Sequence, residues 1–82
     1  MAKSWLYKYG DHTIKVVNKN FDGSELYIDD VLSDQFKGVS LTDRLSAKLE
    51  SGELVTATLE GTLTMNCVLS IDGKPQEPVE VK

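Results

Sequence analysis

Two five-residue stretches of the chain are near copies of each other. Leu26-Tyr27-Ile28-Asp29-Asp30 shares its apolar positions and its turn with Leu69-Ser70-Ile71-Asp72-Gly73, and the second copy begins 43 positions after the first, about half of the 82 residues. Similar units at a fixed offset usually form similar structures, so the chain is expected to fold as two related halves. Neither copy forms a reactive constellation of side chains. The repeat therefore predicts architecture rather than chemistry.

The hydrophobic pattern has a period of two, which is typical of β-strands with one buried face. Alternation runs through residues 14–17 and 25–28 in the first half and through residues 55–60 and 69–71 in the second. The same shift of 43 positions superimposes apolar residues on one another: Ile14 on Ala57, Val16 on Leu59, Leu26 on Leu69 and Ile28 on Ile71. We predict one domain, residues 1–82, with an internal pseudo-repeat at roughly residues 2–38 and 45–81.

Turn-forming residues separate these strands. Asp72-Gly73 predicts a type I′ hairpin turn, because glycine adopts positive φ at no steric cost, and Ser51-Gly52 predicts a second hairpin. Pro75 and Pro78 have no amide proton to donate to a ladder. The last strand, around residues 79–81, is therefore expected at a sheet edge.

Residues 40–50 fit two secondary structures. Ser40 and Asp43 have the spacing of a capping box, and Leu41, Leu45 and Leu49 recur with the period of a helix. Read as a strand, the same segment alternates apolar and polar side chains and leads through a turn into the next strand. The pseudo-repeat favours the strand, because residues 45–49 then correspond to residues 2–6, which also precede a turn.

The predicted fold is all-β, with about seven or eight short strands in two similar antiparallel meanders packed as a small β-sandwich or flattened barrel. The hairpin at Leu69–Gly73 and its copy at Leu26–Asp30 resemble the repeats of the Fas apoptotic inhibitory molecule family, and the whole chain is similar to small bacterial β-domains of unknown function. The first copy departs from that pattern, with Asp30 in the glycine position. The resemblance implies this fold and a non-catalytic role, and it transfers no functional residue.

Charge and cysteine content limit the expected partners and location. The net charge is −4, whereas nucleic-acid binding depends on clustered Lys and Arg, so we expect no nucleic-acid partner. The single cysteine, Cys67, has no partner for an internal disulfide, which favours a reducing compartment such as the cytoplasm. The longest apolar runs are only a few residues and the N-terminus lacks a signal-peptide pattern. We expect no membrane association.

Residues with catalytic potential are sparse. A nucleophile pair would need Cys67 beside His12, with a third group to orient the imidazole. A lone cysteine near Met65 and Val68 is more typical of a small core residue. We predict that the protein is not an enzyme and has no cofactor.

The acidic turn residues allow a second chemical interpretation. Asp29, Asp30 and Asp34 lie close together in sequence, as acid–base pairs can. With Asp22 they also supply enough oxygens for Ca²⁺, but their spacing fits no calcium loop. Aspartates are common in turns because their side chains bind the backbone. We therefore predict no metal site.

An aromatic stripe is the one candidate for binding. Trp5, Tyr7 and Tyr9 share a face if residues 5–9 are extended. Core packing explains them, since a thin β-domain needs large side chains, whereas the repeat alignment places Leu6 on the core face and would turn the stripe outward, so the sequence leaves both orientations open. We therefore predict a non-enzymatic module that binds a protein partner or self-associates through this stripe or through edge strands at residues 3–9 and 79–82. The alternative is a small-ligand or carbohydrate-binding β-domain that uses Trp5, Tyr7 and Tyr9 as a stacking platform.

Overall fold

A computed structural model describes residues 2–39, 42–61 and 64–82. The described residues form nine strands and one short 3₁₀ helix, η1: β1 (Lys3–Tyr9), β2 (His12–Asn18), η1 (Asn20–Asp22), β3 (Ser24–Ile28), β4 (Val31–Phe36), β5 (Thr42–Lys48), β6 (Leu54–Glu60), β7 (Asn66–Ile71), β8 (Lys74–Gln76) and β9 (Glu80–Val81). Among them, no helix is long and apolar enough to cross a membrane.

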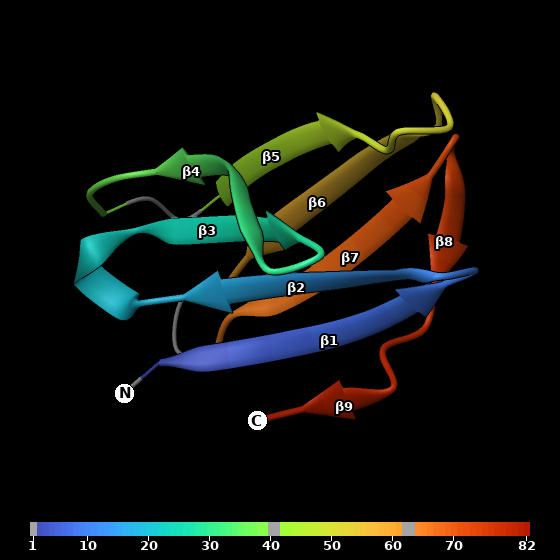
Figure 1. Cartoon of the computed structure of the whole chain (residues 1–82). Coiled ribbons are helices and arrows are strands. Elements are labelled where there is room, and N and C mark those ends of the chain that lie inside the picture. Colours follow the sequence, from blue (N-terminus) through green and yellow to red (C-terminus); the bar gives the residue numbers. More distant parts are fainter. Residues whose placement is uncertain (1, 40–41, 62–63) are drawn as a thin grey trace.

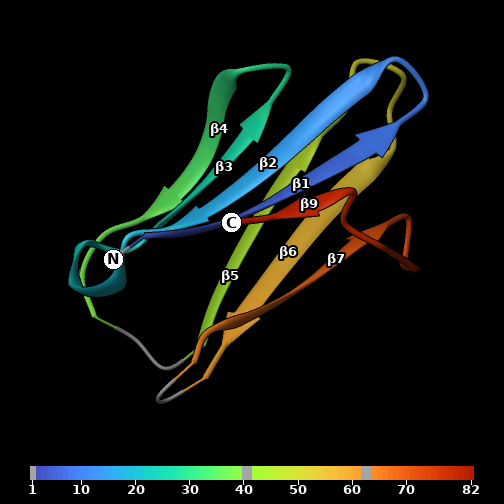
Figure 2. The ribbon, with the colours of Figure 1, turned by 90° about the horizontal axis from the view of Figure 1, so that it is seen from below.

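The strands form two antiparallel sheets. One has the order β4-β3-β2-β1-β9 and the other the order β5-β6-β7-β8. Figure 2 shows them as two separate layers, with the strands of one crossing those of the other. The predicted all-β class and the two-layer, sandwich-like architecture are confirmed. The described residues form nine strands, where the sequence predicts about seven or eight.

Each sheet is built around a four-stranded meander. The first meander runs from Lys3 to Phe36 and the second from Thr42 to Gln76. Figure 1 shows the chain completing the first before it starts the second. An origin by duplication, with units at residues 2–38 and 45–81, stays a prediction.

The hairpin turns of the two copies share their backbone geometry. Asp72 and Gly73 have φ of 50° and 82°, and Asp29 and Asp30 have φ of 51° and 68°. Two central residues with positive φ are the signature of a type I′ turn. Asp30 thus adopts the conformation that its glycine counterpart adopts easily, because aspartate tolerates the left-handed region better than most residues.

The ambiguous segment is a strand. β5 pairs with β6 along its whole length, from Thr42 opposite Glu60 to Lys48 opposite Leu54. Its burial alternates, with Asp43 and Leu45 inside. Ser40 and Leu41, which would begin the alternative helix, lie outside the described residues.

The C-terminal strand is at a sheet edge, as Pro75 and Pro78 predict. β9 pairs with β1 and closes one side of the first sheet, rather than extending the second meander. The expectation of an edge at residues 3–9 is wrong for the same reason: β1 lies between β2 and β9.

The core fills the space between the sheets. Its buried members come from both meanders: Trp5, Tyr7, Ile14, Val16, Leu26, Leu45, Leu49, Val55, Ala57, Leu59, Leu69 and Ile71. Each β-strand directs every second residue inward, which accounts for the period of two in the sequence.

Candidate functional site

The aromatic stripe lies in the core. Trp5 is 4% exposed and Tyr7 is 1% exposed, and Tyr9 is partly buried against the same core. Leu6, which the repeat alignment placed inside, is only half-buried on the opposite face of β1. Of the two orientations that the sequence left open, the outward one, indicated by the repeat alignment, is therefore wrong, and core packing accounts for all three rings.

Cys67 and His12 each have a different partner. The Tyr7 hydroxyl donates to Cys67 Sγ at 3.5 Å, while His12 Nδ1 lies 2.8 Å from Asp29 Oδ2. Burial raises the pKa of the Cys67 thiol, and the Tyr7 hydroxyl bond opposes that shift. A raised pKa disfavours the thiolate, which is the nucleophilic form.

The acidic turn residues bind backbone amides. Asp29 Oδ1 accepts from the Thr13 amide at 2.8 Å. Asp34 accepts from the amides of Gln35 at 2.8 Å and Ser46 at 2.9 Å, and the second of these bonds ties β4 to β5. Within the described ranges, no three His, Cys, Asp or Glu side chains converge as metal ligands.

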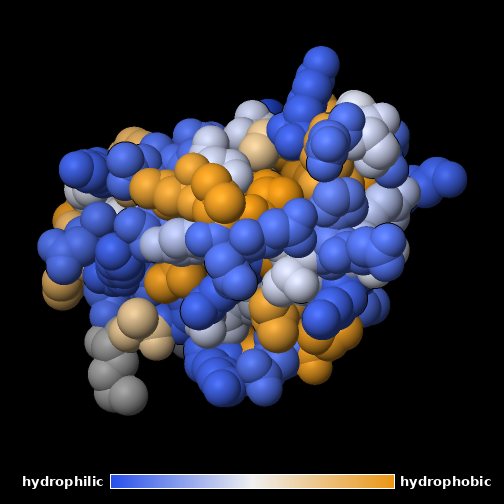
Figure 3. Space-filling view, viewed as in Figure 1, coloured by the Kyte–Doolittle hydropathy of each residue, from blue (hydrophilic) through white to orange (hydrophobic). Residues whose placement is uncertain are grey.

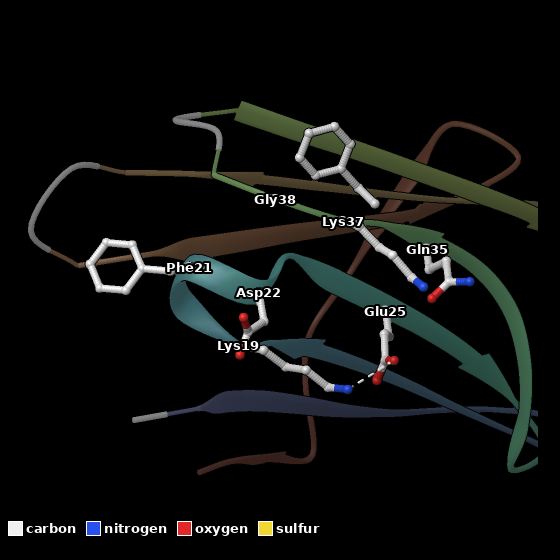
Figure 4. A pocket seen from close by; sticks show the side chains of 8 residues that line it. Lys19, Phe21, Asp22, Glu25, Gln35, Lys37 and Gly38 are labelled. Atoms are coloured by element: carbon white, nitrogen blue, oxygen red, sulfur yellow. Dashed lines mark hydrogen bonds and ion pairs between the residues drawn. The ribbon is translucent and has the colours of Figure 1, made fainter.

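A surface hollow lies between η1 and the C-terminal end of β4. Figure 4 shows Phe21 and Asp22 on the η1 side, and Gln35 and Lys37 on the opposite side. The hollow has a volume of about 480 Å³ and is lined by Lys19, Phe21, Asp22, Glu25, Gln35, Phe36, Lys37 and Gly38. We call Phe21, Phe36 and the charged residues around them (Lys19, Asp22, Glu25 and Lys37) the Phe21–Phe36 patch.

Hydrogen bonds hold η1 in place. The Lys19 amide donates to the Gly23 carbonyl at 2.7 Å, and the Asp22 amide donates to the Lys19 carbonyl at 3.2 Å. The Asn18 side-chain oxygen accepts from the Asn20 amide at 3.2 Å. This closed loop presents Phe21 with 79% of its surface exposed. Singly exposed apolar side chains are common, so it is the hollow that Phe21 shares with Phe36, rather than exposure alone, that makes this loop a candidate site.

Gly23 brings η1 and the end of β4 together. A Cβ atom at Gly23 would lie 1.9 Å from the Phe36 carbonyl oxygen, and its φ is 98°. Only glycine allows both the contact and the conformation. The close approach places Phe21 and Phe36, which is 39% exposed, on the same hollow.

Two of the charged residues in the patch neutralise each other. Lys19 Nζ lies 3.0 Å from Glu25 Oε2, and the Tyr27 hydroxyl donates to Glu25 Oε1 at 2.7 Å. The Tyr27 hydroxyl and the Lys19 ammonium lower the pKa of Glu25, and the Glu25 carboxylate raises the pKa of Lys19. Lys37 and Asp22 form no ion pair within the described part of the chain.

A second hollow continues from the first across the outer face of β2 and β3. It measures about 390 Å³ and shares Lys19 and Glu25 with the first hollow. Its other lining residues are Lys15, Val17, Tyr27 and Asp30. The two hollows make this face of the first sheet uneven rather than flat.

Strand β4 also carries exposed apolar residues at its N-terminal end, away from the patch. Neither of its faces is buried, and Val31 and Leu32 are both exposed. Figure 3 shows hydrophobic surface gathered over the region of β3 and β4. An edge strand with exposed apolar residues is a common place for a second chain to bind.

Sequence reasoning missed Phe21 and Phe36. A signal existed for Phe21, since it stands among turn formers in Asn18-Lys19-Asn20-Phe21-Asp22-Gly23. A phenylalanine inside a turn has no strand face to direct it inward, so such a setting predicts exposure.

Comparisons with protein-family models, curated proteins and solved structures found no match to this chain. The resemblance to the Fas apoptotic inhibitory molecule repeats stays an expectation from the hairpin residues. The function is therefore argued from the patch alone.

Proposed function

We propose that this chain is a non-enzymatic protein-interaction module that binds its partner through the Phe21–Phe36 patch beside edge strand β4. The position of Phe21, 79% exposed on a hydrogen-bonded loop and on the same hollow as Phe36, carries this proposal. A phenylalanine on an ordered backbone offers a large contact area, and only its side-chain torsions remain to be ordered on binding.

The surroundings of the ring support a protein partner. Interfaces combine apolar and polar residues, and here Phe21 and Phe36 line the same hollow as two lysines and two carboxylates. The carbohydrate alternative requires Trp5 and Tyr7 to stack on a ligand, and both rings are buried. In this proposal the module acts in the cytoplasm, because Cys67 is its only cysteine, and the net charge of −4 gives it no affinity for nucleic acid.

The test compares binding by three forms of the chain. Immobilised wild-type chain, Phe21→Ala and Val68→Ala are exposed to cell extract, and the retained proteins are compared by mass spectrometry. Val68 is an exposed apolar residue of β7, which belongs to the other sheet, so its variant controls for general loss of surface hydrophobicity. We expect specific proteins to be retained by wild type and Val68→Ala and lost with Phe21→Ala.

The fold should survive both substitutions, because changes at exposed positions alter stability by only about 0.5 kcal/mol. A retained set that is identical for all three chains would refute the patch as the binding surface. Retention of nothing beyond what the bare matrix binds, together with no self-association of the free chain, would refute the proposed function itself.

A further inference from the structure

The Phe21–Phe36 patch has the chemistry to bind a second copy of itself. We propose that the partner at this patch is another copy of the same chain, related by a two-fold axis that passes near the hollow. This inference rests on the proposed function and names the partner. It follows from the charge balance of the patch, from the positions of its unpaired charges and from the shape of the hollow.

The patch is neutral although the chain is not. Lys19 and Lys37 balance Asp22 and Glu25, whereas the whole chain has a net charge of −4. Two copies of a charged chain repel each other, and like charges placed together at an interface cost several kcal/mol. At this patch two copies can approach without that cost.

The two charges of the patch that form no ion pair with another described residue are complementary to each other. Lys19 and Glu25 already form an ion pair within the chain, which leaves Lys37 and Asp22. Figure 4 shows these two on opposite sides of the hollow, Asp22 with η1 and Lys37 next to β4. A two-fold interface brings the same surface of both copies together. The η1 side of the hollow in one copy then faces the β4 side of the hollow in the other copy. Lys37 of each chain would then face Asp22 of the other.

The hollow provides space for an aromatic ring. Its volume of about 480 Å³ falls within the range of roughly 300–1,000 Å³ that is usual for ligand sites. Phe21 protrudes from one side, so in a two-fold pair the Phe21 ring of each copy can enter the hollow of the other.

The interface would be small. A phenylalanine buries about 150–250 Å², and two from each copy, even with the charged rim, stay below the roughly 800 Å² per partner of a standard interface. We therefore expect a weak dimer, which forms at high micromolar concentration.

The experiment is sedimentation equilibrium at low ionic strength over a wide range of protein concentration. Wild type and Val68→Ala are expected to dimerise with the same affinity, and Phe21→Ala to weaken the dimer by about tenfold or more, as for a hot-spot residue. A monomer at every concentration would overturn the inference. Equal dimerisation by all three would place the interface elsewhere and would overturn it as well.

Charge reversal tests the two-fold contact directly. Asp22→Lys alone and Lys37→Asp alone should each lose dimerisation, because each would place like charges against one another. A mixture of the two variants should form a heterodimer, because both cross-contacts are then of opposite charge. A mixture that stays monomeric while wild type dimerises would overturn the two-fold arrangement. A monomeric wild type that still retains a specific protein through Phe21 would leave the proposed function standing without this inference.

Discussion

Asp29 and Asp72 bind the neighbouring strand in the same way in the two halves of the molecule. The Asp29 amide donates to the Thr13 carbonyl at 2.8 Å, and Asp29 Oδ1 accepts from the Thr13 amide at 2.8 Å. Asp72 makes the equivalent pair of bonds with Leu54, each at 2.9 Å. The aspartate that marks the repeat in the sequence thus joins a type I′ turn to the start of the strand beside it.

Replacing Asp72 tests this role. Asp72→Ala removes the acceptor for the Leu54 amide and places alanine at φ of 50°, and we expect a loss of about 1–3 kcal/mol in the free energy of unfolding. Asp72→Asn keeps a side-chain oxygen and tolerates positive φ, so it should lose clearly less. Urea unfolding of both variants provides the measurement. Equal losses would show that an amide oxygen cannot replace the carboxylate, and an unchanged stability of both variants would show that the side-chain bond contributes nothing.

The strand pattern and the turns were predictable from the sequence because both depend on local residues. Period-two alternation and the Asp-Gly pair specify strands and a hairpin without tertiary information. The segment at residues 40–50 was harder, because Leu45 and Leu49 are four residues apart and a spacing of four lies on one face of either a helix or a strand. Its full pairing with β6 decides for the strand.

The face of the aromatic stripe was not predictable from the repeat. The β1–β2 turn contains residues 10–11, whereas the β5–β6 loop contains residues 49–53. A loop that differs by an odd number of residues reverses which side chains of the preceding strand face the core. The alignment at 43 positions therefore holds for Leu26 and Leu69, which are both buried, and fails for β1.

His12 and Asp29 make stability depend on pH. The hydrogen bond to Asp29 raises the pKa of His12, and the nearby Glu53 and Asp11 carboxylates act in the same direction. The Thr13 amide and then His12 lower the pKa of Asp29. The contribution of His12 is fully present below its unfolded pKa of about 6.5 and is lost as pH rises through its raised folded value. The contribution of Asp29 is present above its unfolded pKa of about 3.9 and is lost as pH falls through its lowered folded value.

The pair should therefore stabilise the fold most between about pH 4 and 6.5. Thermal unfolding from pH 3 to pH 9 should show a decline for wild type as the pH rises above about 6.5 that His12→Gln lacks. Lys15→Gln, which removes an exposed cation elsewhere on β2, provides the control and should follow wild type. A His12→Gln profile parallel to that of wild type would contradict the role of the pair.

Gly23 holds the two sides of the hollow together, and its replacement should be costly. Gly23→Ala combines a φ of 98° with a Cβ atom 1.9 Å from the Phe36 carbonyl oxygen. We expect a loss of roughly 2–5 kcal/mol, from the left-handed conformation and the backbone clash together. Gly10→Ala is the matched control: Gly10 also has positive φ, but a Cβ there has nothing within 4 Å. Similar losses in chemical denaturation would mean that the close approach adds no constraint.

A buried polar group connects the two sheets. Asp43 of β5 is 4% exposed, and its Oδ2 accepts from the Ser24 hydroxyl at 3.0 Å, while the Asn18 amide group donates to that hydroxyl at 3.1 Å. Asp43 Oδ1 has no partner within the described ranges. Asp43→Ala should lose about 1–3 kcal/mol, because the Ser24 hydroxyl is left buried without its acceptor.

Asp43→Asn separates the hydrogen bond from the charge. The amide oxygen can still accept from Ser24, and the substitution removes a carboxylate whose second oxygen has no compensating bond. We expect Asp43→Asn to be more stable than Asp43→Ala in urea unfolding. If Asp43→Asn were as unstable as Asp43→Ala, the carboxylate itself would be required.

Ile71 and Ile28 occupy matching positions in the repeat but differ in burial. Ile71 is among the largest fully buried side chains, whereas Ile28 is only partly buried against the core. Truncation of a buried isoleucine to alanine costs about 2–5 kcal/mol, with the amount set by the cavity that remains. We expect Ile71→Ala to lose an amount of unfolding free energy within that range and Ile28→Ala to lose less. Denaturant unfolding provides the measurement, on the condition that the slope of free energy against denaturant concentration is the same for all variants. Equal losses would mean that the two halves pack equivalently although the two isoleucines differ in exposure. An Ile71→Ala variant with unchanged stability would contradict a shared core between the sheets.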